Sequence, residues 1–217
     1  MVKTCIINVA IGEGYQRIQK RMEKSVLEHG FKGDVLLWQD WANDMFPKDC
    51  IYNIKAGALF EAILRGYRRI LWLDASIYAV NDVNPILDII SKDGYYFWKN
   101  GNNAAQECND KCLDYYGIIR DKAEDIPMLG SGMFGIDLDT RIGQNIAVCF
   151  MQAAIDGIFI GKRGANKIES KDPRFLHHRQ DQSALSLIAN QFSCKLHNNE
   201  HISYEPNSTH IFGIQGI

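Results

Sequence analysis

The sequence predicts an α/β protein built on a mainly parallel β-sheet. The first observation is the stretch Arg69–Val80, which reads R-I-L-W-L-D-A-S-I-Y-A-V. Its apolar run at 70–73 is too short for a helix and too apolar for an exposed strand, so it predicts a buried central strand of a parallel sheet. The second is the order of elements, since strand patterns at 3–11 and 35–38 are each followed by a segment of helical spacing. The third is an apolar content of 46%, enough for a sizeable core.

Length and charge limit the possible classes of protein. A chain of 217 residues predicts one domain, 1–217, with at most a small subdomain. A net charge of −2, from 24 basic and 26 acidic residues, gives no polycation for nucleic acid. No apolar run approaches the ~20 residues of a membrane span, and no cleavage site follows the N-terminal strand pattern. We therefore expect a cytoplasmic protein with no nucleic-acid partner and no membrane span.

The six cysteines are scattered along the chain, and only Cys108 and Cys112 lie close together. A zinc site there would need two further ligands nearby, and the neighbouring sequence offers none. The cysteines are expected to be free, reduced thiols, as is usual for intracellular proteins.

The N-terminal segment predicts a strand at 3–11, a turn at 12–15 and an amphipathic helix at 16–29. The G-x-G at Gly12 and Gly14 suggests a dinucleotide fingerprint, but Arg17 stands where its third glycine belongs. The apolar side of this helix is expected to face the sheet through Ile18, Met22, Val26 and Leu27.

The next strand and helix are expected at 35–38 and 53–66. Asp40 follows the strand at its carboxyl end, where it can accept hydrogen bonds from a base or ribose, or cap the next turn. Lys55 lies in the first helical turn, where the positive helix end favours anions, although a solvated surface lysine is the alternative. The residues expected to face the sheet are Ala56, Leu59, Phe60, Ile63 and Leu64.

Asp74 and Ser76 follow the central strand. Ligands of open α/β sheets bind outside the carboxyl ends of the strands. A strand followed by D-x-D or D-x-S can place two oxygen ligands on one side of a turn. Oxygen ligands suit Mg²⁺ or Mn²⁺, usually shared with substrate phosphates.

The middle of the chain predicts a strand at 77–80, a helix from Asn84-Pro85 to 90, and a strand at 94–98. The polar segment 99–117 is expected to form a helix with a mobile, acceptor-facing entry loop. Glycines within 127–137 permit close approach of backbone to a ligand. Thr140 is expected to cap a helix at 141–155. The basic segment 158–172 predicts a solvated loop or a lid over phosphates.

Near the C-terminus, the adjacent His177 and His178 do not share a helix face, so this pair alone does not predict a metal site. Asp181-Gln182 precedes an apolar helix at 183–188 in a capping arrangement. A short strand is expected near 202–204. His210 is either a structural or surface histidine or a metal ligand.

Two segments, Lys55–Ala62 and Gly66–Ser76, resemble the core of GT-A glycosyltransferases. In that family a lysine-bearing helix leads into the strand that ends in the D-x-D motif. This chain departs from the motif at Ser76, where the family usually has a second acidic residue. The resemblance implies a GT-A three-layer α/β/α sandwich with a mainly parallel central sheet. The whole chain also resembles the N-terminal domain of chlorovirus capsid glycosyltransferases, which implies capsid glycosylation in a host cytoplasm and a longer protein.

The GT-A resemblance also implies roles for particular residues. It places Asp74, Ser76 and His210 around a Mn²⁺ or Mg²⁺ ion, and it makes Asp74, Asp181 and Lys55 the expected catalytic residues. The N-terminal part would bind the nucleotide and the C-terminal part the sugar and acceptor. The expected binding residues are Ile11, Gly12, Tyr15 and Asp40 for the nucleotide, Lys55, Asp74, Ala75 and Ser76 for the diphosphate, and Gly130, Ser131, Gly132, Arg179, Asp181 and Gln182 for the sugar.

The expected function is metal-dependent transfer of a sugar, of hexosyltransferase type, from a nucleotide-diphosphate donor, UDP-sugar above all, to a glycan or glycoprotein. Metal and Lys55 would neutralise the leaving diphosphate. The D-Q and His-x-x-Gly features resemble retaining families. One alternative is a sugar-phosphate nucleotidyltransferase, although 11–15 lacks the basic residues of its phosphate loop. A catalytically weak sugar-nucleotide-binding module is another, because Ser76 replaces an acid.

Overall fold

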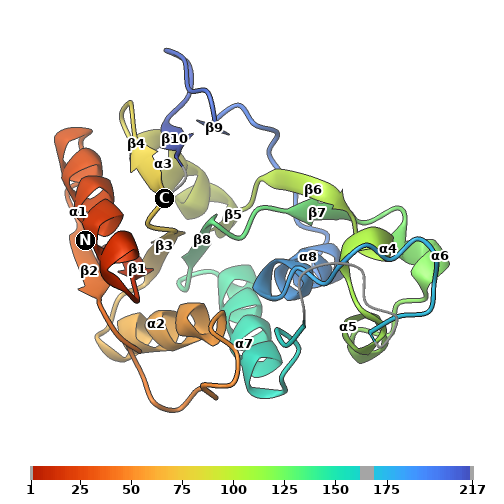
Figure 1. Ribbon diagram of the computed structural model, residues 1–217. Coiled ribbons are helices and arrows are strands. Elements are labelled where there is room, and N and C mark those ends of the chain that lie inside the picture. The colour runs from red at the N-terminus through yellow and green to blue at the C-terminus, as the bar shows by residue number, and fades with distance from the viewer. Residues whose placement is uncertain (1, 162–168, 216–217) are drawn as a thin grey trace.

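A five-stranded sheet forms the centre of the computed structural model, which describes residues 2–161 and 169–215 (Figure 1). The strand order is β2-β1-β3-β8-β5. β1 (Thr4–Val9) pairs in parallel with both β2 (Asp34–Trp38) and β3 (Arg69–Leu73). β8 (Met133–Asp137) runs antiparallel between β3 and β5 (Tyr95–Tyr96). The mainly parallel sheet expected from the sequence is confirmed.

Helices cover both faces of this sheet, which gives three layers. α1 (Glu13–Glu28) and α3 (Asn84–Asp93) pack on one face. The other face carries α2 (Asn53–Leu64), α7 (Arg141–Ile155) and α8 (Asp181–Gln191). Successive residues of β3 alternate between the two cores, as expected for a strand buried on both faces.

Two side chains predicted to face the sheet are exposed instead. Leu27 has 49% of its surface accessible and Leu64 has 63%. Each belongs to the last turn of its helix, α1 and α2 respectively, where Val26 and Ala62 are the buried residues, so both leucines lie beyond the edge of the buried face. Helical spacing predicted other buried positions of both helices correctly, since Met22, Val26 and Leu59 are fully buried.

Two smaller sheets extend the central one. β4 (Ile77–Ala79) pairs with β10 (Phe212–Ile214), which also pairs with β9 (Ile202–Ser203). β6 (Lys99–Asn103) pairs with β7 (Pro127–Leu129). The C-terminal segment therefore returns to the strand that follows Asp74.

The segment 99–117, predicted to be a helix with a mobile loop, is instead a strand and two short helices. α4 (Ala104–Glu107) and α5 (Asp110–Tyr115) follow β6, and α6 (Arg120–Ala123) lies beyond them. Asn103 and Asn109 start these helices, because their side chains accept hydrogen bonds from the backbone N–H groups of Gln106 and Cys112. Repeated capping residues thus divide a stretch that composition alone suggested was one helix.

Several smaller expectations are confirmed. Thr140 caps α7 by accepting a hydrogen bond from the Gly143 N–H. All six cysteines are free, and four of them, including Cys108 and Cys112, are buried. Within the described residues, no helix combines the length and apolarity needed to cross a membrane.

Candidate active site

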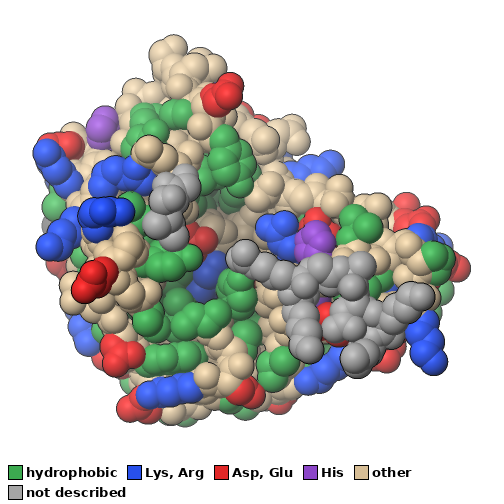
Figure 2. Space-filling model, viewed as in Figure 1, with side chains coloured by type: hydrophobic (Ala, Val, Ile, Leu, Met, Phe, Trp, Pro, Cys, Tyr) green, Lys and Arg blue, Asp and Glu red, His purple; other side chains and the backbone are tan. Residues whose placement is uncertain are grey.

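A cavity of about 520 Å³ opens beside the carboxyl ends of the parallel strands. A hollow is visible on the face of the molecule shown in Figure 2. Asp74 and Ser76, which follow β3, line this cavity together with Lys55 of α2. Ser131, Gly132, Arg179 and Gln182, all predicted to bind sugar, line it too. The structure therefore brings together residues from four separate stretches of the chain.

Lys55 forms the centre of a buried ionic group at this cavity. Its Nζ lies 3.2 Å from Asp74 Oδ1 and 2.9 Å from Asp181 Oδ2. The same atom donates a hydrogen bond of 2.8 Å to the Ser131 carbonyl. One ammonium group thus connects the first turn of α2, the end of β3, the β7–β8 turn and the start of α8.

The three charged side chains differ in exposure. The accessible fraction is 6% for Lys55, 2% for Asp181 and 39% for Asp74, so Asp74 is the most exposed of the three at the cavity. Burial alone would lower the pKa of Lys55, but attraction by Asp181 and Asp74 outweighs it and raises that pKa. The pKa of Asp74 is also raised, because desolvation and the nearby Asp181 carboxylate together exceed the stabilisation by Lys55.

Asp74 presents one oxygen to the cavity. Its Oδ1 accepts a 2.8 Å hydrogen bond from Trp72 Nε1 in addition to the Lys55 contact. Its Oδ2 accepts no hydrogen bond from any described residue and faces Gly132, where an added Cβ would lie 3.2 Å away. Ser76 lines the same cavity, and no described side chain or backbone group bonds its hydroxyl. A carboxylate oxygen and a hydroxyl are suitable ligands for Mg²⁺ or Mn²⁺.

The residues predicted to bind the nucleotide lie outside the cavity lining. Ile11 and Gly12 follow β1, and Asp40 follows β2, at the same edge of the sheet as Asp74 because the three strands are parallel. Tyr15 is 49% exposed at the start of α1. Asp40 is exposed, and its Oδ1 accepts a hydrogen bond of 2.7 Å from the backbone N–H of the next residue, Trp41.

The other predicted binding residues divide into two groups. Arg179 donates to Gln182 Oε1 at 2.9 Å, and Gln182 Nε2 donates to the Asn100 carbonyl at 3.0 Å, so both line the cavity in fixed positions. Gly130 and the buried Ala75 do not line it, and Gly130 packs directly against the Trp98 ring. Asp181 lies behind the cavity wall and makes no side-chain cap, since it is the first residue of α8 and is paired with Lys55.

His210, predicted to be a metal ligand, lies away from Asp74. In the β4–β10 ladder Phe212 pairs with Ala79 and Ile214 with Ile77, so the chain moves away from Ser76 as it is followed back to 210. The Asn81 side chain donates a 2.6 Å hydrogen bond to the His210 carbonyl. The His210 ring accepts a hydrogen bond from the Asn207 N–H at its Nδ1.

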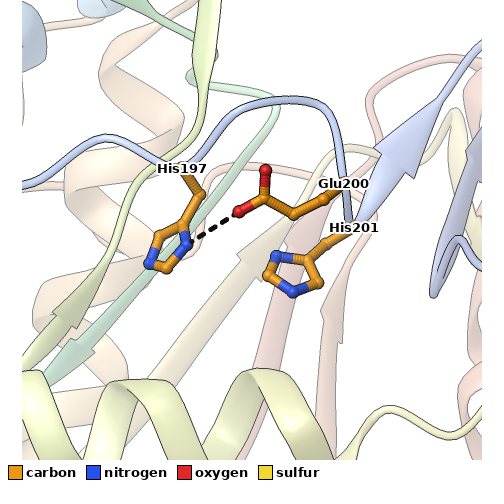
Figure 3. A group of neighbouring side chains, drawn as sticks. All are labelled: His197, Glu200 and His201. Carbon is orange, nitrogen blue, oxygen red and sulfur yellow. Dashed lines mark hydrogen bonds and ion pairs between the residues drawn. The ribbon is translucent and has the colours of Figure 1, made fainter.

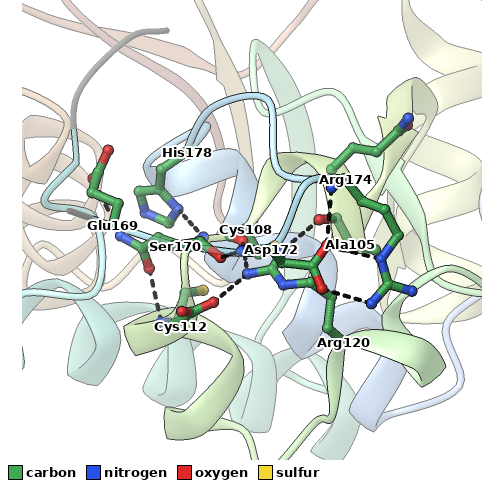
Figure 4. A network of polar contacts seen from close by, with 12 residues as sticks. Ala105, Cys108, Cys112, Arg120, Glu169, Ser170, Asp172, Arg174 and His178 are labelled. Carbon is green, nitrogen blue, oxygen red and sulfur yellow. Dashed lines mark hydrogen bonds and ion pairs between the residues drawn. The ribbon is translucent and has the colours of Figure 1, made fainter. Parts of the chain in front are cut away.

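The segment that leads into Arg179 is held by a network of charged side chains (Figure 4). Arg174 pairs with Asp172 at 2.7 Å, with Asp121 at 2.9 Å and with Glu124 at 2.8 Å. Arg120 pairs with Asp110 and donates to the carbonyls of Ala105 and Cys108. Residues 162–168 of the predicted basic loop or lid lie outside the described residues.

His178 supports this segment from inside the protein. It is fully buried, its Nδ1 accepts from the Asn109 N–H at 3.3 Å, and its Nε2 donates to the Ile158 carbonyl at 2.9 Å. Desolvation lowers the pKa of His178, and the ring is neutral in this arrangement. His178 therefore has a structural role, whereas its neighbour His177 lines the cavity.

Comparison with known proteins bears on the fold. No family model matches the sequence, and no curated protein matches it. The apo form of mouse xyloside xylosyltransferase 1 is similar in structure, with a TM-score of 0.50 and 9% sequence identity over 93% of this chain and 87% of that one. The chain has a GT-A-like glycosyltransferase fold. At this identity the likeness supports the three-layer architecture predicted from the sequence and says nothing about donor or acceptor.

Several cavity residues of this GT-A-like fold were not predicted from the sequence. They come from loops and strand ends whose sequence has no recognisable motif, and they include Tyr52, Trp98, Asn100, His177, Tyr204 and Ile214. Chain order gives no sign that 98–100, 177 and 204 meet. A second feature was also missed, the spacing H-x-x-E-H at 197–201, which could have been recognised as a possible metal motif.

Proposed function

We propose that this protein is a glycosyltransferase that transfers a sugar from a nucleotide-diphosphate donor, with a UDP-sugar as the expected donor. The observation that carries the proposal is the Asp74 carboxylate, which projects into a cavity at the carboxyl edge of the sheet and is held from behind by buried Lys55. Ligands of open α/β sheets bind at this edge. The GT-A-like fold agrees with the proposal but does not carry it.

Asp74 Oδ2 and the Ser76 hydroxyl would hold Mn²⁺ or Mg²⁺ together with the donor diphosphate. When bound, such an ion supplies Lewis-acid stabilisation of charge on the leaving diphosphate. With few protein ligands, binding of this ion should depend on the nucleotide. The contribution of His210 to this metal site stays a prediction.

The roles of Lys55 and Asp181 follow from their mutual contact. Lys55 fixes Asp74 and adds positive charge at the base of the cavity, close to where the diphosphate would lie. Asp181, with 2% of its side chain exposed, has no access to an acceptor hydroxyl. A general base must lie within hydrogen-bond reach of its proton. This burial supports transfer with retention, in which the leaving diphosphate assists deprotonation of the acceptor.

The nucleotide base is proposed to bind along the ends of β1 and β2, near Ile11, Gly12, Tyr15 and Asp40, in the N-terminal part of a single domain. A glycan or glycoprotein acceptor would enter from the side of Arg179 and Gln182. The closer likeness to chlorovirus capsid glycosyltransferases, and with it a role in the host cytoplasm, rests on the sequence resemblance.

The test is nucleotide-sugar hydrolysis and transfer in the presence and absence of Mn²⁺. Asp74→Asn should lower the rate at least ~100-fold, because the metal contributes several kcal/mol to the transition state. Asp44→Asn, an exposed aspartate paired with Lys48, is the matched control and should retain the wild-type rate. Full activity of Asp74→Asn would contradict the proposal. Donor binding without turnover would favour the weak binding module, and pyrophosphate release from UTP and a sugar phosphate would favour the nucleotidyltransferase.

Stereochemistry is tested separately by proton NMR of the first product formed from an α-linked donor. We expect an α-linked product. A β-linked product would contradict retention and would require Asp181 to become exposed as a base.

A further inference from the structure

A group of potential metal ligands lies outside the cavity, between α8 and β9 (Figure 3). His197, Glu200 and His201 each offer one ligand atom, and these atoms lie within 4.8 Å of one another. His197 Nδ1 and Glu200 Oε1 are 3.2 Å apart. All three residues come from the stretch H-N-N-E-H.

The His197 imidazole is held in place before any ion binds. Only 8% of this residue is exposed. The backbone N–H of His197 donates to the Phe97 carbonyl at 2.9 Å, and the backbone carbonyl of His197 accepts from the Lys99 N–H at 2.7 Å. The ring stacks on buried Tyr96, with centroids 5.0 Å apart and planes inclined by 16°.

His201 is fixed by the same tyrosine. The Tyr96 hydroxyl and His201 Nδ1 are hydrogen-bonded at 3.1 Å, an arrangement like those that orient metal-bound histidines. The His201 carbonyl accepts from the N–H groups of Ile211 and Phe212, each at 2.9 Å. The two histidine rings lie 5.5 Å apart. Glu200, with 47% of its side chain exposed, is the one member free to adjust.

We propose that His197, Glu200 and His201 form a zinc site separate from the donor cavity. Two imidazoles and a carboxylate suit Zn²⁺, whereas the all-oxygen set at Asp74 and Ser76 suits Mg²⁺ or Mn²⁺. Tetrahedral zinc, with bonds of about 2.0–2.2 Å, places its ligand atoms roughly 3.3–3.5 Å apart. The His197–Glu200 pair, at 3.2 Å, is close to this spacing, and all three ligand atoms lie within 4.8 Å of one another, so the set would contract around a bound ion. A water would occupy the fourth position.

The site is structural rather than hydrolytic. In zinc peptidases the H-x-x-E-H motif lies on a helix. Here it lies in the turn that joins the Trp98–His197 bridge to β9, so that chemistry does not carry over. An ion at this place would connect Tyr96 of β5 to the C-terminal segment that carries Tyr204 and Ile214 into the cavity wall. The inference does not depend on the proposed function, because no donor-site residue contributes a ligand.

The experiment is a Zn²⁺ titration of chelator-treated, full-length protein by calorimetry, without nucleotide. We expect one ion per chain with a micromolar or lower dissociation constant, in the wild type and equally in Asp74→Asn. Glu200→Gln and His201→Asn should each weaken binding by about 10-fold or more, by loss of a ligand. Glu205→Gln, exposed in the same segment, and His29→Asn, at the end of α1, are matched controls and should bind as the wild type does.

Cobalt substitution gives a readout that does not depend on activity. Co²⁺ bound to the wild type should show the intense visible absorption of tetrahedral coordination, and Glu200→Gln should lose it while keeping a native circular dichroism spectrum. The absence of zinc uptake, or equal affinity in Glu200→Gln and His201→Asn, would overturn the proposal. So would loss of zinc binding in Asp74→Asn, since that would place the ion in the donor cavity.

Discussion

At the scale of single residues, Lys55 determines the charge balance of the candidate site. Its removal leaves Asp181 buried and Asp74 half-buried without their cation. Loss of one partner of a buried ion pair typically costs about 3–5 kcal/mol. We expect Lys55→Met to lower the free energy of unfolding by about that amount, measured by urea denaturation, and to abolish activity.

Two further variants make this prediction specific. Lys48→Met removes an exposed lysine whose partner is Asp44, and it should leave the urea midpoint unchanged. Lys55→Met combined with Asp181→Asn should recover part of the lost stability, because the second change removes the unpaired buried charge. A single Lys55→Met variant as stable as the wild type would refute the assignment of a buried ionic centre.

His178 predicts how stability depends on pH. Its pKa in the folded protein is lowered by burial from an ordinary value of 6.5, so its contribution to stability is present above 6.5 and is lost as pH falls through the folded-state pKa. Protonation would also break the Asn109 N–H to Nδ1 hydrogen bond. We expect His178→Gln, which can keep one donor and one acceptor, to reduce the loss of stability between about pH 7 and 5. Chemical denaturation at several pH values measures this.

A residual slope is expected even in His178→Gln. The pKa of His201 is also lowered, chiefly by desolvation. An unchanged pH profile in His178→Gln would mean that this ring does not control acid sensitivity.

Sequence reasoning at this scale found the residues that follow a recognisable local pattern. Asp74 was predictable because an apolar strand ends at an acid, and Lys55 because it lies in a first helical turn. The pairing of Lys55 with Asp181 was not predictable, since it depends on how α2 and α8 pack. The position of His210 depends on the register of β10 against β4, which the sequence alone does not specify.

At the scale of elements, the irregular segment 169–180, which precedes α8, supports the wall of the cavity. Arg174 joins it to α6 and its neighbours through Asp121 and Glu124, while also pairing with Asp172 (Figure 4). We expect Arg174→Ala to raise backbone hydrogen exchange across 169–180 and to raise the KM for the donor. The reason is that loosening this segment displaces Arg179, a lining residue.

The matched control is Arg141→Ala, an exposed arginine at the start of α7. It should alter neither hydrogen exchange across 169–180 nor KM. If Arg174→Ala exchanges as slowly as the wild type, the charged network does not hold the segment.

Helices and strands were predicted correctly where the segment is long and periodic. The prediction failed where tertiary contacts or local capping determine the bounds or the buried face of an element. α2, β3 and α7 were predicted within a few residues. The exposed Leu27 and Leu64 show that helical spacing does not specify the edges of the buried face. The short helices α4 and α5 show that local capping by asparagine can divide a polar stretch.

At the scale of the whole molecule, the alternation of strands and helices along the sequence predicted a parallel sheet but not the complete order of its strands. The apolar run 133–137 fits a parallel or antiparallel neighbour of β3 equally well, and the structure makes it antiparallel. The antiparallel placement of β8 next to β3 brings the turn at Ser131 and Gly132 beside Asp74, because β8 begins where β3 ends. The cavity is therefore a product of topology. The sequence indicated its residues at 55, 74, 76, 131–132, 179 and 182, but not those at 52, 98, 100, 177, 204 and 214.

The same topology predicts how ligands stabilise the whole protein. A donor that contacts the ends of β1 and β3 and the start of α8 joins parts that come from the whole length of the chain. At a hundredfold excess over its dissociation constant, a ligand of the native state adds about 2.7 kcal/mol of stability. For a domain of this size each kcal/mol raises the Tm by roughly 2–4 °C.

We expect UDP with Mn²⁺ to raise the Tm accordingly, and Mn²⁺ alone to have little effect at the donor cavity. In Asp74→Asn the additional shift caused by Mn²⁺ should disappear while UDP alone still stabilises. A larger shift with GDP or with a nicotinamide cofactor than with UDP would contradict the donor assignment, and an undiminished Mn²⁺ effect in Asp74→Asn would contradict the metal assignment.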